Sequence, residues 1–267
     1  MQRPYSGTGF WAVILGGSGG IGWAVARQLA ASGMNLCLVY RERRAQVREF
    51  ESNVEQLRSS GISILTFNED AGNPEAMQKV IDELKQQISP GDKIRLLLHS
   101  VAKGNLKTMN AGEDQRTLNT QDFQLTLDAM VLSWYRWTQE LIQQKMFAPD
   151  ARLLALTSEG SSRAWPGYGA VATAKAALEA MARNMAVEFA PLGIRCNVLQ
   201  PGVTDTVSMR MIPGSEEMKK MAAQRNPFKR LTAPEDVARV ADLMCRDESA
   251  WINGAIIPVD GGESISA

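Results

Sequence analysis

The hydrophobic residues of this chain fall into short uninterrupted runs that are separated by longer amphipathic stretches. The runs predict strands at residues 11–15, 35–40, 62–67, 94–99, 153–157 and 194–199. Residues 20–32 and 43–60, and the segments between the later runs, have helix-type patterns. Because strands without polar alternation are typical of strands buried on both faces, the pattern predicts a parallel sheet covered by helices.

Strands and helices alternate along the chain, and no internal repeat or Pro/Ser-rich linker interrupts them. Alternating elements of this kind connect through right-handed crossovers and build one sheet. We therefore expect an α/β fold in which residues 1–267 form a single domain, with a doubly wound parallel sheet of about seven strands and helices on both faces. Two stretches that follow strand ends look irregular, 102–120 and 203–227, and the second is expected to be a substrate flap because open α/β sheets bind ligands at strand ends.

Composition excludes several classes of function. The 29 basic residues balance 29 acidic ones, so no chain-wide attraction to nucleic acid or to an anionic membrane is expected. The sequence begins without a signal-peptide pattern and has no apolar stretch of membrane-spanning length, which predicts a cytoplasmic protein. Three irregularly spaced cysteines and a single histidine, His99, favour a reducing compartment and predict no metal site.

A glycine-rich loop, Gly16-Gly17-Ser18-Gly19-Gly20-Ile21-Gly22, follows the first predicted strand and opens the first predicted helix. Glycine permits a tight turn and lets a pyrophosphate approach the backbone closely. The first turn of the helix offers free N–H groups and the positive end of the helix dipole. The loop therefore predicts a dinucleotide site that includes Gly16, Ser18, Gly20, Ile21 and Gly22.

Gly16, Gly20 and Gly22 match the Gly-x-x-x-Gly-x-Gly motif of the short-chain dehydrogenase/reductase family, although Leu15 stands where many members have Thr. The chain resembles this family over nearly its whole length, as far as Val259-Asp260-Gly261-Gly262. The resemblance implies a Rossmann-type domain and a homo-oligomer, either a dimer or a tetramer. It also implies cofactor contacts from segments after the third, fourth and sixth strands, namely Asp70, Ala71, Ser100, Val101, Ala102, Pro201, Gly202, Val203 and Thr206.

The end of the second predicted strand indicates which dinucleotide binds. NAD enzymes usually place an acidic residue there, which binds the ribose 2′-hydroxyl. Here Tyr40 occupies that position and Arg41 follows it, and a guanidinium binds phosphate in a fork and stacks on adenine. We therefore expect NADPH, with NADH as the less favoured alternative because Glu42 offers an acceptor to a ribose hydroxyl.

Tyr168 and Lys175 are the candidate catalytic residues. Ordinary members of the family place the tyrosine four residues before the lysine, but that position is Val171 here, which cannot donate a proton. Seven residues of α-helix fall about 20° short of two turns, so Tyr168 and Lys175 can share one helix face. This spacing, together with His99-Ser100-Val101-Ala102, resembles the divergent branch of the family, the enoyl-acyl-carrier-protein reductases.

The resemblance implies NADPH-dependent reduction of the C=C bond of an enoyl thioester, carried on an acyl carrier protein or on coenzyme A. In this hypothesis Tyr168 stabilises the enolate oxygen, and Lys175 binds the nicotinamide ribose and favours ionisation of Tyr168 through its charge. Ser158 occupies the family's serine position and shares the contact with the oxygen, although many relatives in this branch carry a second tyrosine there. His99 is expected to be structural rather than catalytic.

Two other functions compete with enoyl reduction. A carbonyl reductase would use the displaced Tyr168 on a ketone, but Met130 stands where carbonyl-reducing members place a supporting asparagine. A non-catalytic NADPH-binding regulator would not need to retain both Tyr168 and Lys175.

The predicted flap is rich in methionine, with Met209, Met211 and Met218 beside Ile212. Thioethers adapt to irregular apolar shapes, so the flap suits an acyl chain, although an ordinary helix that covers the core fits equally well. A basic cluster follows in the sequence and would attract an acidic acyl carrier protein, unless its charges are simply solvated. Its members are Lys219, Lys220, Arg225, Lys229 and Arg230.

Overall fold

Seven parallel strands form one sheet in the order β3-β2-β1-β4-β5-β6-β7 in the computed structural model, which describes residues 3–110 and 117–266. The strands are β1 (Phe10–Leu15), β2 (Asn35–Tyr40), β3 (Ile64–Asn68), β4 (Lys93–His99), β5 (Phe147–Leu156), β6 (Arg195–Pro201) and β7 (Ile256–Val259). The order reverses between β1 and β4, and such a switch point leaves a crevice at the carboxyl ends of the strands. The predicted fold class is confirmed.

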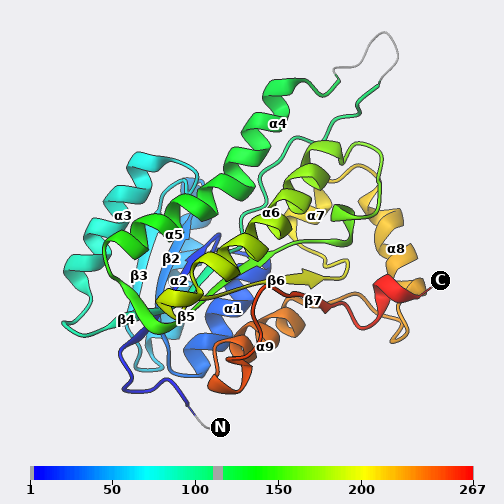
Figure 1. The fold of residues 1–267 in the computed structure, drawn as a ribbon. Coiled ribbons are helices and arrows are strands. Elements are labelled where there is room, and N and C mark those ends of the chain that lie inside the picture. The colour runs from blue at the N-terminus through cyan, green and yellow to red at the C-terminus, as the bar shows by residue number, and fades with distance from the viewer. Residues whose placement is uncertain (1–2, 111–116, 267) are drawn as a thin grey trace.

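Helices cover both faces of the sheet (Figure 1). The first face is covered by α3 (Pro74–Gln87), α4 (Thr120–Leu127), α5 (Ser133–Gln143) and α6 (Gly169–Glu188), and the second by α1 (Gly20–Ala31), α2 (Arg44–Arg58) and α9 (Pro234–Met244). Alternate residues of each strand enter separate cores. In β1, for example, Val13 packs into the first core and Ile14 into the second, as the uninterrupted apolar runs predict.

The bounds of β5 differ most from the prediction. β5 begins at Phe147 rather than at residue 153 and ends before Thr157, because Phe147 pairs with Ile94 on β4 across a register shift. The early part of β5 contains Pro149 and Asp150, which carry no strand signal in the sequence.

The stretch 203–227 is not irregular, so that part of the prediction is wrong. It contains α7 (Val207–Arg210) and α8 (Ser215–Arg225), which lie together at one end of the molecule in Figure 1. The Thr206 hydroxyl caps α7 by accepting a hydrogen bond from the Met209 N–H, and Gly214 precedes α8 with a positive φ of 77°. Of the stretch 102–120, residues 102–110 and 117–119 lie outside helices and strands, and residues 111–116 fall outside the described part of the chain.

A π-helical turn at Asp128–Leu132 joins α4 to α5, which the sequence did not predict. Its hydrogen bonds span five residues, so it inserts one extra residue into an otherwise continuous helical segment. Met130 lies in this turn and is buried. The turn therefore contributes buried side chains to the first core.

Candidate active site

The carboxyl ends of β1 and β4 form the centre of the candidate site. The Ser100 N–H donates to the Leu15 carbonyl over 2.8 Å, and the N–H groups of Gly16 and Gly17 both donate to the Val39 carbonyl on β2. These bonds join the start of the glycine-rich loop to β2, and the end of β1 to the segment that follows β4. The loop therefore opens at the switch point of the sheet, where a dinucleotide is expected.

The glycines of this loop let a ligand approach the protein backbone closely. Gly16 has a φ of +87°, and a Cβ placed on it would lie 2.5 Å from the Ser100 carbonyl oxygen. A side chain on Gly22 would collide with the Gly16 carbonyl, so α1 packs directly against the loop. A Cβ on Gly19, in contrast, would meet no atom within 4 Å. The loop is thus closely packed at Gly16 and Gly22 and open at Gly19. The first-turn N–H groups of α1 lie beside it, and these residues fit a pyrophosphate.

The adenosine end of the expected site carries paired charges. Arg41 Nη1 donates to Asp70 Oδ2 over 2.7 Å, and Lys103 Nζ donates to the same oxygen over 2.9 Å. Burial raises the pKa of Asp70, but the bonds from Lys103, the Gly72 N–H and Arg41 outweigh it and bring the pKa to about 2. Glu42, the residue that left NADH open, accepts a 2.9 Å hydrogen bond from the Ser18 hydroxyl.

The nicotinamide end is expected near the loop that follows β6. A Cβ on Gly20 would lie 3.2 Å from Thr206 Cγ2, so Thr206 adjoins the glycine-rich loop. The Val203 N–H donates to the buried carboxylate of Glu263, and a side chain on Gly202 would collide with Glu263 and Thr232. The structure therefore brings segments far apart in the sequence to one edge of the sheet.

Lys175 is buried beneath this edge. Its Nζ donates a 2.6 Å hydrogen bond to the carbonyl of Leu156, the last residue of β5. Burial lowers the pKa of Lys175 to about 8, against an upward influence of Glu179 one helical turn away. An ammonium has three donors, so Lys175 keeps capacity for ribose hydroxyls.

The surroundings of His99 keep its imidazole neutral, and its structural role stays a prediction. It is buried at the end of β4, where its Nε2 lies 2.8 Å from the Ser133 hydroxyl. Burial and the nearby charge of Lys175 lower its pKa to about 3.

Tyr168 immediately precedes α6 as its N-cap residue, so it is not itself part of the helix. Its hydroxyl lies 3.4 Å from the Ser158 Oγ, and its ring covers Gly160, where a Cβ would be 2.6 Å from the ring. Lys175 and Tyr168 are thus both tied to the end of β5, through Leu156 and Ser158 respectively.

The expected ionisation of Tyr168 by Lys175 is not what the structure of the free protein indicates. Burial raises the pKa of Tyr168, and the hydrogen bond with Ser158 opposes this only in part. The phenol is therefore protonated at neutral pH and is a hydrogen-bond donor.

Val171, in the position where ordinary members carry the tyrosine, is buried in the apolar core instead. A Cβ on Gly104 would lie 2.5 Å from Val171 Cγ2 and 3.4 Å from Met130 Sδ, so these three residues pack together. No hydroxyl or amide of Val171 or Met130 is available there for proton transfer.

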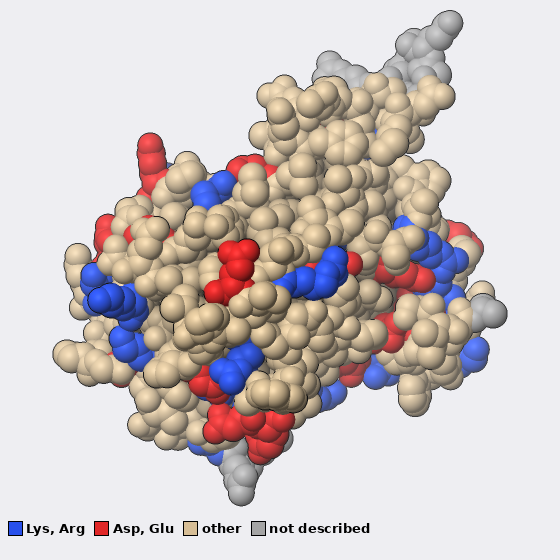
Figure 2. Space-filling view, in the orientation of Figure 1, with Lys and Arg blue, Asp and Glu red and all other residues tan. Residues whose placement is uncertain are grey.

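The basic cluster of the flap is largely neutralised by ion pairs. Lys219 binds Asp205 and Glu216, and Lys220 lies 4.0 Å from Glu217. Arg225 and Arg230 also pair with acids, and Lys229 donates to a backbone carbonyl. In Figure 2 blue and red side chains adjoin one another over the end of the molecule where Figure 1 shows α7 and α8. The cluster therefore carries less free positive charge than its sequence suggests.

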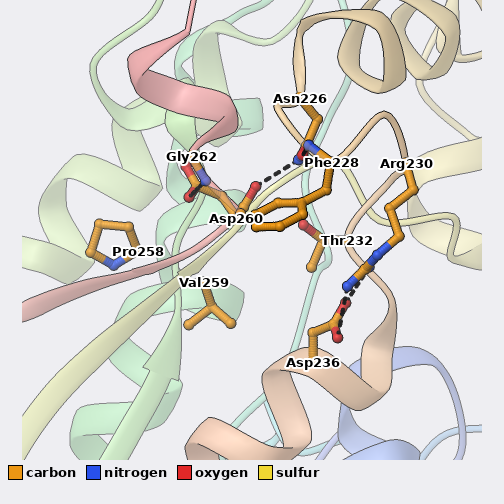
Figure 3. Close-up of a pocket in the computed structure, with 10 residues that line it drawn as sticks. Asn226, Phe228, Arg230, Thr232, Asp236, Pro258, Val259, Asp260 and Gly262 are labelled. Atoms are coloured by element: carbon orange, nitrogen blue, oxygen red, sulfur yellow. Dashed lines mark hydrogen bonds and ion pairs between the residues drawn. The ribbon is translucent and has the colours of Figure 1, made fainter.

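A cavity of about 370 Å³ opens at the carboxyl end of β7 (Figure 3). Phe228, Pro258 and Val259 give it apolar walls, and the Arg230–Asp236 ion pair lies at one side. None of Ser158, Tyr168 and Lys175 is among its lining residues. The cavity is thus separate from the candidate catalytic residues.

Two properties concern the described residues as a whole. No helix within residues 3–110 or 117–266 combines the length and apolarity needed to cross a membrane. Over the same residues no group of three or more His, Cys, Asp and Glu side chains is arranged to hold a metal ion.

Several functional candidates escaped the sequence-based prediction. Lys103 follows the predicted cofactor segment by one residue, and its position after a strand end was the available signal. Glu159 and Glu263 gave no local signal, because their importance arises from contacts with Arg225 across 66 and 38 residues.

The parallel sheet, the glycine loop at its switch point and a buried lysine and a tyrosine that both contact the end of β5 define a dinucleotide-dependent oxidoreductase. A family model described as "Enoyl-(Acyl carrier protein) reductase" matches residues 16–264, and the chain belongs to this family of short-chain dehydrogenases/reductases.

Individual relatives differ in the reactions that their names state. The chain is 26% identical to an NADPH-dependent aldehyde reductase-like protein of Arabidopsis thaliana, over 98% of this chain and 96% of the relative. It is 28% identical to 1-cyclohexenylcarbonyl-CoA reductase of Streptomyces collinus, over 96% and 87%. The structure of an enoyl-[acyl-carrier-protein] reductase (NADH) from Aquifex aeolicus superposes with a TM-score of 0.81 at 23% identity, covering 98% of each chain, which supports the shared fold.

Proposed function

We propose that this protein uses NADPH to reduce the C=C bond of an enoyl thioester. The observation that carries the proposal is the displaced tyrosine: Val171 and Met130 are buried together in the apolar core at the ordinary position, while the Tyr168 hydroxyl lies beside Ser158. Membership of the enoyl-reductase family and the similarity to a CoA-thioester reductase add support.

The displacement matches the chemistry in size. In ketone reduction hydride reaches the carbonyl carbon itself, whereas in enoyl reduction it reaches a carbon two bonds away. Two C–C bonds of about 1.5 Å place the carbonyl about 2.5 Å further off. Tyr168 is the N-cap residue of α6, three positions before Val171, so its attachment lies about 4.5 Å further along the axis of α6, which is of the same order. The acidic hydroxyl thus moves with the oxygen that it serves.

The residues have separate roles in this proposal. Bound NADPH would supply the hydride. The protonated Tyr168 donates a hydrogen bond to the thioester oxygen and stabilises the enolate that develops there, and the Ser158 hydroxyl assists it. The α-carbon of the enolate then takes up a proton, which gives the saturated thioester. Lys175 holds the nicotinamide ribose with the donors that Leu156 leaves free, and its charge favours the negative enolate.

The preference for NADPH rests on Arg41 and Lys103. Both cations already meet at Asp70, so a 2′-phosphate that arrives there finds two positive groups and one carboxylate. Glu42, bonded to Ser18, lies in the same region and would weaken the preference rather than reverse it.

An assay of NADPH oxidation with two matched thioesters tests the function. We expect turnover with crotonyl-CoA, whose C=C bond is conjugated, and at least about 100-fold lower kcat/KM with acetoacetyl-CoA, which offers a ketone. The reverse ratio would replace the proposal by the carbonyl-reductase function. Tight NADPH binding without oxidation of either substrate would favour the regulator.

Carbonyl reduction is the second candidate, and one observation favours it. Ser158 and Tyr168 bring two hydroxyls within 3.4 Å of each other, which is suited to holding a single carbonyl oxygen of a ketone or an aldehyde. The aldehyde reductase-like relative is consistent with that use.

Three further proposals concern the carrier of the acyl group, the cellular location and the oligomeric state. The acyl group is carried on coenzyme A or on an acyl carrier protein, the second of which would meet the flap. The protein acts in the cytoplasm. It assembles as a homo-oligomer, and apolar side chains such as Leu132, Phe228 and Trp251 are exposed in the single chain and available for that contact.

A further inference from the structure

Arg225, the last residue of α8, makes ion pairs with two segments that are distant in the sequence. Its Nη1 and Nη2 donate to the two carboxylate oxygens of Glu159 over 3.1 and 2.6 Å. Nη2 also donates to Glu263 Oε1 over 3.0 Å. The guanidinium is only 17% exposed, so these bonds are partly shielded from water and from salt.

Glu159 lies between the two residues that contact Tyr168. The residue before it, Ser158, approaches the Tyr168 hydroxyl, and the residue after it, Gly160, lies under the tyrosine ring. The backbone position of Glu159 therefore affects both contacts. Arg225 holds that position from outside the segment by a two-pronged bond, whose geometry tolerates little rotation.

Glu263 connects the same guanidinium to the loop after β6. Its side chain is 2% exposed, and its carboxylate accepts the Val203 N–H. A side chain on Gly202 would lie 2.7 Å from Glu263 Oε2, so the carboxylate packs directly against this loop. A buried carboxylate needs a positive partner, and Arg225 is the cation that binds it among the described residues.

Apolar packing contributes little to holding α8. Only Ser215 and Ala222 of its eleven residues are buried, and Met221 is 51% exposed. Helices with few buried contacts open locally at low cost in free energy. The ion pairs of Arg225 are therefore a principal tie between α8 and the body of the enzyme.

We infer that Arg225 is a positioning residue. It fixes residues 158–168, which include Tyr168, and the loop after β6, residues 202–206, relative to each other whenever α8 is packed against the body of the enzyme. This inference rests on the proposed role of Tyr168, although the coupling of the segments does not depend on which substrate is reduced. Substrate that seats α8 through the flap would thereby also set the catalytic hydroxyl.

Kinetics of Arg225 variants give the first test. In Arg225→Met we expect kcat to fall about tenfold, with the dissociation constant for NADPH nearly unchanged. Arg225→Lys should recover part of the loss, because the charge remains and the two-pronged geometry does not. Glu159→Gln should cost less than Arg225→Met, because Arg225 also binds Glu263. The double variant should cost little more than Arg225→Met alone, since both changes break the Arg225–Glu159 contact. Fully additive losses would contradict the inference.

Hydrogen exchange gives a second test that needs no substrate. In Arg225→Met, and more weakly in Arg225→Lys, we expect about tenfold faster exchange in both 158–168 and 202–206. The matched control is Arg27→Met, which breaks the Arg27–Glu235 pair between α1 and α9 and should leave both segments unchanged. Exchange that accelerates only within α8 would overturn the inference. If no thioester is reduced but both segments loosen, the proposed function fails while the coupling stands.

Discussion

A positive charge is buried at each end of the parallel strands, here called the amino edge and the carboxyl edge of the sheet. The two charges differ in how completely they are hydrogen-bonded. At the amino edge, Arg152 has no exposed surface, and it donates hydrogen bonds to Asp150 and to the carbonyls of Met244 and Arg246. At the carboxyl edge, Lys175 is almost as buried, yet its hydrogen bond goes to one carbonyl, that of Leu156. A fully bonded charge stabilises a structure, whereas an incompletely bonded one is available for a ligand.

Side chains at the amino edge also cap the C-terminal end of α9. Arg95 and Arg152 donate to the carbonyls of Cys245 and Met244, which α9 leaves without helical partners at its end. Asp150 accepts bonds from these two arginines and from Arg195. Burial raises the pKa of Asp150, but the arginine bonds and charges prevail and hold the pKa below its usual value. This carboxylate is therefore ionised and needed for stability.

Removal of the Asp150 charge should have the largest effect on stability. Asp150→Asn removes the counter-ion that two buried guanidiniums share, and only Arg95 keeps another acidic partner among the described residues, Asp247. We expect the free energy of unfolding to fall by about 3 kcal/mol. Urea denaturation at pH 7 measures this loss. Because the pKa of Asp150 is depressed when folded, its contribution is present above the ordinary value of 3.8 and disappears at lower pH.

Asp82→Asn is a matched control for this experiment, because Asp82 is exposed on α3 and bonds only to Gln78 among the described residues. It should change the free energy of unfolding by less than about 0.5 kcal/mol. A loss below about 1 kcal/mol in Asp150→Asn would mean that the amino edge does not depend on its charges.

Lys175→Met, in contrast, should raise the free energy of unfolding. A folded pKa of about 8 against an ordinary 10.5 corresponds to a penalty on the order of 3 kcal/mol at neutral pH. Loss of the bond to Leu156 returns about 1 kcal/mol of this, so the variant should be about 2 kcal/mol more stable at pH 7 while losing turnover.

The pH dependence checks the cause. The lowered pKa means that the unfolded chain binds more protons between pH 8 and 10.5, so the stability of the unmodified protein rises over that range. The advantage of Lys175→Met should therefore shrink as the pH increases above about 8. A variant that is less stable at pH 7 would show that Lys175 is a structural group like Arg152.

The sequence predicted the carboxyl edge better than the amino edge. Glycines and a strand–loop–helix order are local signals, so the dinucleotide loop and β2 are found where they were expected. Arg95, Arg152 and Arg195 lie in three different strands, and nothing in their local sequence indicates that they converge on Asp150.

The π-helical turn and the flap helices also escaped prediction, for two physical reasons. One extra residue per turn at Asp128–Leu132 barely changes the hydrophobic periodicity. In α8 the polar surface carries almost no periodic signal, because ion pairs rather than apolar contacts hold it.

A smaller effect is expected on the preference for NADPH over NADH when Arg41 is replaced. Arg41→Ser removes one of two cations near Asp70, and we expect the dissociation constant for NADPH to rise about tenfold while that for NADH changes little. Isothermal titration calorimetry measures both constants. Arg48→Ser, at an exposed position on α2, is the control. Equal weakening of both dinucleotides would assign Arg41 to some part of the site other than a 2′-phosphate.

The smallest effect is expected at the flap surface. Reversal of charge at Lys219 and Lys220 should raise KM about threefold for a carrier-bound enoyl substrate and leave KM for the coenzyme A thioester unchanged. The effect is small because both lysines already lie near acids. Equal changes for both substrates would remove the proposed carrier protein as a partner.

The most direct test of the central claim is the turnover of Tyr168→Phe with crotonyl-CoA, compared with Tyr135→Phe on α5. The phenol at the carboxyl edge is proposed to stabilise the enolate, so its loss should lower kcat at least about 100-fold, with NADPH binding intact and Tyr135→Phe unaffected. Undiminished turnover in Tyr168→Phe would contradict the account.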